Sequence, residues 1–341
     1  MKKTEQFIID FAKAILNIPS PSGYSSNVIE YIKQRAKDMG YNSRLTKKGN
    51  LIIEVKGKED YTIGLSSHVD TLGAMVRSIN SDGELKFTTI GGPIWPTLDG
   101  EYCLVHTRDG KDFTGTFLSN SPSSHVYKEA NSQKRNPDNM IVRIDEVVKN
   151  KKDVEKLGIF PGDFIFFDPK TTVTKSGFIK SRFLDDKISV AIIFGLLNHL
   201  KQENITPKYN LKVIISTYEE VGHGASFIPE LDELIAVDMG CIGEDLSCTE
   251  FDVSICAKDS SGPYDYDIVT KLVNISKENK LNFVTDIYPF YGSDVSAAYR
   301  GGTDFRGGLI GPGVHASHGM ERTHIDALTS TFKLLLNYIT K

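Results

Sequence analysis

The sequence lacks the long apolar run, of roughly 18 residues, that a membrane-spanning helix requires. It also lacks an apolar signal core near its start, where the residues after Gln6 form an amphipathic pattern instead. Its four cysteines have no CxxC spacing, which in a chain of this size favours reduced, partly buried thiols. These absences predict a cytoplasmic protein.

An excess of charge of one sign is also missing. The 40 basic and 44 acidic residues leave a net charge of −4, which gives no electrostatic reason to expect a nucleic acid or an anionic membrane as partner. Hydrophobic residues make up 40% of the 341 positions, as is usual for a soluble globular protein. The length allows one large domain or two smaller ones, and neither an internal repeat nor a low-complexity tract interrupts the chain.

Two parts of the chain have the rhythm of an α/β fold, in which helical periodicity alternates with short apolar runs. The first part predicts helices and strands at residues 7–15, 25–38, 50–55 and 61–67. The second part predicts a helix from about residue 185, buried strands and two later helices, at residues 211–217, 233–237, 266–279 and 324–339.

The segment between these parts has a different pattern of apolar and polar residues. Its short alternating runs, separated by turn residues, predict antiparallel strands at residues 85–89, 102–107, 113–118, 140–147 and 163–167. Residues 120–139 are rich in Ser, Asn and Lys and predict a long polar loop. The sequence therefore predicts an α/β domain of residues 1–73 and 176–341, interrupted by a small β-rich domain of residues 74–175.

Carboxylates and histidines occur where the predicted strands end and where a predicted helix begins. These candidates are His68, Asp185, Glu219, Glu220, Asp238 and His318. In open α/β sheets, sites are built at the carboxyl ends of strands. Together the residues have the composition of a two-metal site that hydrolyses with a metal-activated water, although the histidines near the C-terminus could also form a surface cluster.

Each motif taken alone also has an ordinary explanation. His68 and Asp70 share one side of a strand, so the aspartate could hold the second ring nitrogen, or both could be solvated. Asp185 could simply cap its helix. Glu219 and Glu220 could be exposed loop acids, or one could bind metal while the other accepts a proton from water.

The motifs, in their order, resemble those of the TET-type aminopeptidases. This family of dinuclear zinc exopeptidases includes glutamyl aminopeptidases and proteins once labelled endoglucanases. The resemblance covers nearly the whole chain and rests on Ser-His-Val-Asp-Thr-Leu-Gly at 67–73, Arg-Phe-Leu-Asp-Asp-Lys at 182–187, Tyr-Glu-Glu-Val-Gly-His-Gly-Ala at 218–225, Ala-Val-Asp at 236–238, Gly-Ser-Asp at 292–294 and His-Gly-Met-Glu at 318–321.

The resemblance implies a zinc-aminopeptidase-like α/β/α catalytic domain with an inserted, barrel-like dimerisation domain. It implies peptide substrates with a free N-terminus, and a homo-oligomer that is a dodecamer or a dimer. It also implies two divalent metal ions per chain, Zn²⁺ first, with Co²⁺ or Mn²⁺ as alternatives. It implies that His68 and Asp238 bind one metal, that Glu220 and His318 bind the other, and that Asp185 bridges the two metals. It also implies that Glu219 is the general base and that Asp70 holds the imidazole of His68.

Three residues depart from the family pattern, namely Thr71, His315 and Gly319. They lie near the expected site, so the side-chain preference of the substrate is left open. The alternative functions are a deacylase or deblocking peptidase on the same metals, a glycoside hydrolase that uses a carboxylate pair, and a non-catalytic shell protein. A glycosidase would be insensitive to chelators and leaves the histidines unexplained, and the presence of Glu219 argues against a protein without activity.

Overall fold

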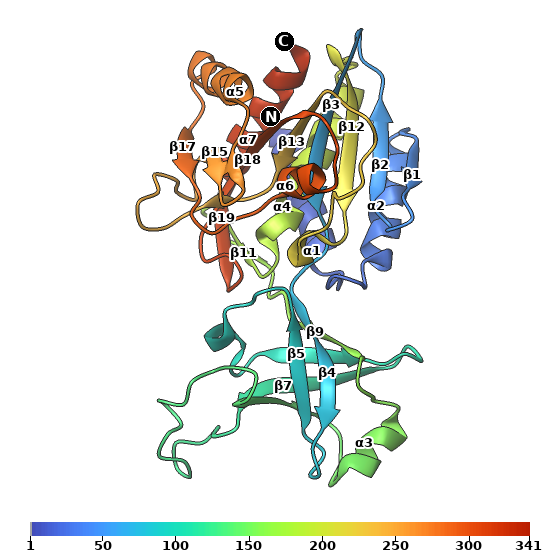
Figure 1. Ribbon diagram of the computed structural model, residues 1–341, viewed down its shortest axis with the longest axis vertical. Helices are drawn as coiled ribbons and strands as arrows, with labels where there is room; N and C mark the ends of the chain where they lie inside the picture. Colours follow the sequence, from blue (N-terminus) through green and yellow to red (C-terminus); the bar gives the residue numbers. More distant parts are fainter. Residues whose placement is uncertain (1) are drawn as a thin grey trace. The chain divides into compact units, whose positions relative to one another are not determined.

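The computed structural model describes residues 2–341, which fall into two compact units (Figure 1). Unit 1 comprises residues 2–71 and 170–341, and unit 2 comprises Leu72–Pro169. The sequence predicts that the inserted domain spans residues 74–175. Residues 170–175 belong to unit 1 because β10 (Thr172–Val173) pairs with β11 (Phe178–Ser181), which pairs in turn with β19 (Glu321–His324).

Unit 1 is built on a ten-stranded mixed sheet. Its strand order is β1 (Ser43–Leu45), β2 (Leu51–Val55), β12 (Tyr209–Ser216), β3 (Glu59–His68), β13 (Glu233–Val237), β18 (Arg306–Val314), β15 (Val253–Asp259) and β16 (Gly262–Pro263), with β14 (Gly240–Cys241) on β18 and β17 (Phe283–Ile287) on β15. The central strands β12, β3, β13 and β18 are parallel, so their carboxyl ends meet at one edge.

Helices cover both faces of this sheet. They are α1 (Lys2–Leu16), α2 (Ser26–Asp38), α4 (Leu184–Gln202), α5 (Tyr266–Glu278), α6 (Asp294–Arg300) and α7 (Ile325–Thr340). A Cβ added at Gly307 would collide with Val295 of α6, whereas one added at Gly308 would collide with Ile268 of α5. Because successive strand residues point to opposite faces, α6 and α5 lie on opposite sides of β18.

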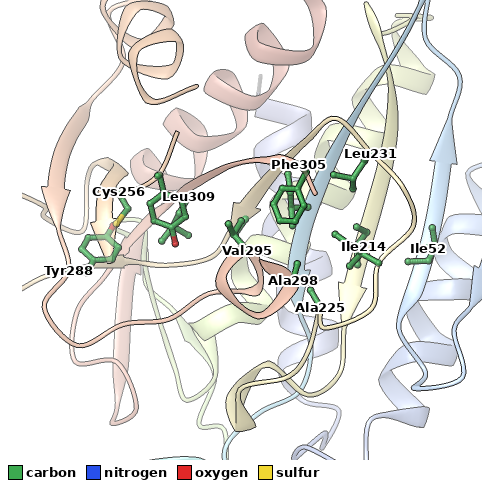
Figure 2. Close-up of a cluster of buried hydrophobic side chains, with 14 residues drawn as sticks. Ile52, Ile214, Ala225, Leu231, Cys256, Tyr288, Val295, Ala298, Phe305 and Leu309 are labelled. Atoms are coloured by element: carbon green, nitrogen blue, oxygen red, sulfur yellow. The ribbon is translucent and has the colours of Figure 1, made fainter. Parts of the chain in front are cut away.

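A hydrophobic cluster fills the space between the sheet and α6 (Figure 2). Ile214 of β12 and Leu309 of β18 are fully buried there, together with Val295 and Ala298 on α6. Burying such side chains contributes roughly 1.5–3 kcal/mol each. This packing holds α6, and the loop before it, at a defined place on the sheet.

Strand β18 is not predicted from the sequence, because its glycines and Pro312 read as turn residues. In the structure it is nearly fully buried. A Cβ at Gly311 would collide with the backbone carbonyl of Asp238, and one at Gly313 would collide with the carbonyl of Thr249. Glycine is therefore present for close backbone approach rather than for a turn.

Unit 2 contains a closed barrel, which confirms the predicted small barrel-like insertion. Going round the barrel, the strands are β4 (Gly73–Ile79), β5 (Leu85–Ile90), β8 (Met140–Ile144), β7 (Asp112–Ser119), β6 (Tyr102–His106) and β9 (Phe164–Phe167). Phe117 packs edge-on against Phe87 at 4.8 Å and against Phe167 at 5.2 Å between ring centroids. The unit also has η1 (Trp95–Leu98) and α3 (Lys151–Leu157), and residues 120–139 form the predicted loop.

Candidate active site

Three neighbouring parallel strands bring four of the predicted site residues to one edge of the sheet. His68 is the last residue of β3, and Asp238 directly follows β13. Glu219 and Glu220 lie in η2 (Glu219–Val221), the turn that follows β12. Since β3 pairs in parallel with both β12 and β13, these residues from distant parts of the chain meet at the carboxyl ends of the strands.

Asp185, at the start of α4, lies between two histidines. Its Oδ1 atom is 3.2 Å from Nε2 of His68, and its Oδ2 atom is 3.6 Å from Nε2 of His318. His318 comes from the loop between β18 and β19, and its Nε2 atom is also 3.5 Å from Oε2 of Glu220. One carboxylate therefore faces two imidazoles through different oxygens, as a bridging ligand would.

Among residues 2–341, two groups of three side chains, neither of which includes His318, have donor atoms within 4.8 Å of one another. The groups are His68, Asp186 and Asp238, and His68, Asp185 and Glu220. Asp186 is not among the predicted ligands. Its Oδ2 atom accepts hydrogen bonds from the hydroxyl of Ser67 and from the backbone nitrogen of His68. Asp186 thus fixes the end of β3, next to the metal-ligand candidates.

Asp70 is fully buried and organises the backbone of the site. The Nδ1 atom of His68 is 3.0 Å from the backbone carbonyl oxygen of Asp70 and 3.6 Å from its carboxylate, so the carbonyl is the nearer partner. The carboxylate accepts hydrogen bonds from the backbone nitrogens of Glu219 and Glu220, at 3.1 and 3.2 Å. It also accepts one from the hydroxyl of Ser22 at 2.5 Å. Asp70 therefore connects β3 to the turn of the two glutamates.

The site contains several buried carboxylates close together, and added positive charge would stabilise their ionised forms. Burial, reinforced by neighbouring carboxylates, raises the pKa values of Glu219 and Glu220 well above the usual range. Burial, followed by repulsion from Asp185, raises the pKa of Asp238 to about 7. Burial alone would lower the pKa of His68, but the carboxylates of Asp185 and Glu219 raise it well above its ordinary value.

These residues fit divalent metal ions. Two imidazoles and several carboxylate oxygens are a donor set that suits Zn²⁺, Co²⁺ or Mn²⁺. The five predicted ligands exceed the number that a single tetrahedral ion requires. A bound cation would also compensate the carboxylates that the fold has buried side by side.

A cavity of about 250 Å³ opens onto the same side chains. The ligand candidates Asp185, Glu220, Asp238 and His318, together with Glu219, form one part of its wall. The remaining wall comes from Gly222, directly after η2, and from α6 and the loop before it, with Phe290, Tyr291, Gly292, Ser293, Ala297 and Arg300. The cavity is smaller than the roughly 300–1,000 Å³ of pockets for drug-sized ligands, so it suits a single residue of a substrate.

Comparison with known proteins identifies the family. The model of the M42 glutamyl aminopeptidase family matches residues 49–334. The chain belongs to the M42 family. It is 45% identical, over 99% of its length and 98% of the relative, to the protein called "Putative aminopeptidase YhfE" in Bacillus subtilis (strain 168).

Solved structures share the fold of this M42 chain. The TET aminopeptidase from the marine sediment archaeon Thaumarchaeota archaeon SCGC AB-539-E09 matches with a TM-score of 0.88 and 18% identity, covering 98% of this chain and 96% of that one. The Pyrococcus horikoshii TET1 peptidase, described as assembling into a tetrahedron or a large octahedral shell, matches with a TM-score of 0.85 and 23% identity over 98% and 99% of the two chains.

Membership of the M42 family confirms several predictions. The TET-type resemblance is correct, and the protein is a peptide-bond hydrolase of the aminopeptidase class, in a metal-dependent family. Among residues 2–341, no helix is long and apolar enough to cross a membrane. The individual roles of the site residues, and the number and identity of the metals, stay predictions.

A buried glutamate of this M42 site, Glu321, has no function predicted from the sequence. Glu321 accepts hydrogen bonds from the backbone nitrogens of Asp185 and His318, each at 3.0 Å, and so ties together the two segments that carry these ligand candidates. Its position in His-Gly-Met-Glu, three residues after a candidate ligand, was the available signal.

The sequence likewise predicts no role for Asp294, in Gly-Ser-Asp. It is buried, and it accepts hydrogen bonds from the hydroxyl of Ser216 at 2.7 Å and from the backbone nitrogen of Ala225 at 3.0 Å. It therefore holds α6 against the chain on both sides of the glutamate turn. The sequence shows the motif but not these partners, because both lie far away along the chain.

Proposed function

We propose that this protein removes N-terminal residues from peptides by means of two divalent metal ions held in the cavity. His68 and Asp238 would hold one ion, Glu220 and His318 would hold the other, and Asp185 would contribute to both sites. The observation that carries this proposal is the position of Asp185, whose two oxygens lie 3.2 and 3.6 Å from the two histidines. When bound, such ions lower the pKa of a water molecule and polarise the peptide carbonyl.

Glu219 is the proposed general base. Its Oε2 atom lies 3.7 Å from Nε2 of His68, at the edge of the ligand group and facing the cavity. The raised pKa of its buried carboxyl suits a group that takes a proton from the attacking water and returns it to the leaving nitrogen. The hydrogen bond from its backbone nitrogen to Asp70 keeps the side chain at this edge.

The small, acid-lined cavity supports a preference for a free terminal amine. A free, unprotonated amine has a nitrogen lone pair that a bound metal ion could accept, whereas the nitrogen of an acylated N-terminus has none to donate. The cavity also has room for about one residue, which favours attack at the chain end. A deacylase would instead have to bind the acyl group of its substrate in this polar cavity.

The test uses a matched pair of peptides, one with a free N-terminus and one N-acetylated. The protein is treated with a chelator and then reconstituted with Zn²⁺, Co²⁺ or Mn²⁺, and the products are identified by mass. We expect release of the first residue from the free peptide only, lost after chelation and restored by metal. Release of acetate or of an acyl-amino acid would instead establish the deacylase.

We further propose that unit 2 joins copies of this chain into a homo-oligomer. Its surface carries large apolar side chains with few neighbours, among them Val126 and Val147, which are 72% and 93% exposed. Tyr102 and Phe160 are exposed on the same unit. Exposed apolar side chains of this size are typical of protein interfaces. None of the predicted ligands lies in unit 2, so its surface is available for assembly.

A further inference from the structure

We infer that Lys48 is a positioning residue, which holds the turn bearing Glu219 and Glu220 at the distance that catalysis requires. The inference rests on the proposed function and extends it to a residue outside the cavity. Lys48 lies in the turn between β1 and β2, far from the glutamates in sequence. Its ammonium group crosses to the segment that follows η2, and its own backbone contacts the segment that precedes η2.

The contacts after the turn involve several acceptors at once. The Nζ atom of Lys48 donates to the backbone carbonyl of His223, to that of Gly224 at 3.2 Å and to the hydroxyl of Ser226 at 3.1 Å. The Nδ1 atom of His223 also lies 3.1 Å from this Nζ atom, so the acceptors outnumber the three donors of the ammonium and this segment can satisfy all of them. Hydrogen bonds from a charged donor are stronger than those between neutral groups. The segment after η2 is therefore held by a strong contact.

The contacts before the turn come from the same hairpin. The hydroxyl of Thr217 donates to the backbone carbonyl of Lys48 at 3.2 Å and to the side-chain oxygen of Asn50 at 3.0 Å. The amide of Asn50 donates in turn to the carbonyl of Gly224 at 2.9 Å. Residues on both sides of η2 are thus attached to one rigid support, and η2 itself closes over Asp70.

Aromatic packing and charge complete this support. The Lys48 ammonium lies 5.6 Å from the ring centre of Tyr218, whose ring stacks on His223 at 5.0 Å. It is also attracted by the carboxylates of Asp70 and Asp294, which hold the same turn from the other side. Lys48 therefore contacts the segments on both sides of η2 without lining the substrate cavity.

The test replaces Lys48 by methionine, which keeps most of the side-chain length and removes the donors and the charge. We expect kcat on a free aminoacyl amide to fall by roughly ten- to a hundredfold, as a displacement of about 1 Å can produce. KM should change little, because the cavity wall is untouched. Since Glu220 lies in the same turn, the metal-free variant should also bind Zn²⁺ more weakly in competition with a chromogenic chelator.

Two further variants separate positioning from a general folding defect. Lys47→Met is the matched control, because Lys47 is the exposed neighbour, and it should behave like the wild-type protein. Lys48→Arg retains charge and donors and should restore most of the lost kcat. Should Lys48→Met unfold, Ser226→Ala removes one acceptor of the same contact and should lower kcat more mildly, with KM unchanged.

The outcomes distinguish this inference from the proposed function. If the wild-type protein does not cleave free peptides, the proposed function is wrong. If the wild-type protein is active and Lys48→Met matches Lys47→Met in kcat and Zn²⁺ binding, the positioning role is wrong. A loss of kcat that Lys48→Arg does not reduce, accompanied by an equal rise in KM, would also overturn it.

Discussion

Replacing Glu219 by glutamine should abolish most of the activity while leaving the metals in place. Glutamine keeps the size of the side chain and the backbone hydrogen bond to Asp70, but it cannot accept a proton. General-base catalysis contributes about 10²–10⁴ in rate. Each factor of ten corresponds to about 1.36 kcal/mol, so the activation barrier should rise by roughly 2.7–5.4 kcal/mol.

The adjacent residue supplies the comparison that makes this prediction sharp. Glu220 lies 3.5 Å from His318, so Glu220→Gln should weaken one metal site as well as turnover. Glu244→Gln, a change at an exposed glutamate that does not line the cavity, is the control for the loss of one carboxylate. The assay measures kcat on an aminoacyl amide and the metal content of the same samples by elemental analysis. Equal metal loss in Glu219→Gln and Glu220→Gln would refute the assignment of the pair.

Three other predictions test the remaining elements. A metal-replete sample should contain more than one metal ion per chain by elemental analysis, and Asp185→Asn should lower the occupancy of both metal sites. A maximum of one ion per chain in the wild-type protein would exclude a bridging role for Asp185. Replacing residues 120–139 by a two-residue turn between Ser119 and Met140, which pair across β7 and β8, should give smaller particles by light scattering with metal retained. Gly311→Ala should lower the midpoint of thermal unfolding, because its Cβ meets the Asp238 carbonyl, unlike the control Gly243→Ala in open space.

The sequence predicts those parts of unit 1 whose apolar runs are uninterrupted. Strands β12 and β13 are buried along most of their length, and their Val, Ile and Leu residues mark them clearly. The carboxylates that follow these strands mark their ends, since a charged side chain rarely continues a buried strand. For the same reason the positions of Glu219 and Asp238 at a common sheet edge could be expected before the structure.

The sequence does not predict elements whose residues are chosen by distant neighbours. The glycines of β18 are set by the backbone of residues 238 and 249, which no local pattern reveals. Helix α6 has only seven residues and lies against the hydrophobic cluster through Val295 and Ala298, too few for a helical period to be recognised. Both elements border the cavity or its support, so local rules fail close to the site.

Asp70 illustrates the same limit within the site. The period of a strand predicts that its side chain lies on the side of His68, and the resemblance makes it the partner of that imidazole. In the structure the backbone carbonyl of Asp70 is nearer to the ring, and the carboxylate binds the nitrogens of Glu219 and Glu220. By accepting hydrogen bonds from two backbone nitrogens, the buried carboxylate avoids the free-energy cost of leaving these donors without a partner. A second contact to the imidazole would contribute less, because the carbonyl already holds the ring. The sequence thus predicts which residues build the site, whereas the parallel pairing of β3 with β12 decides which of them hold one another.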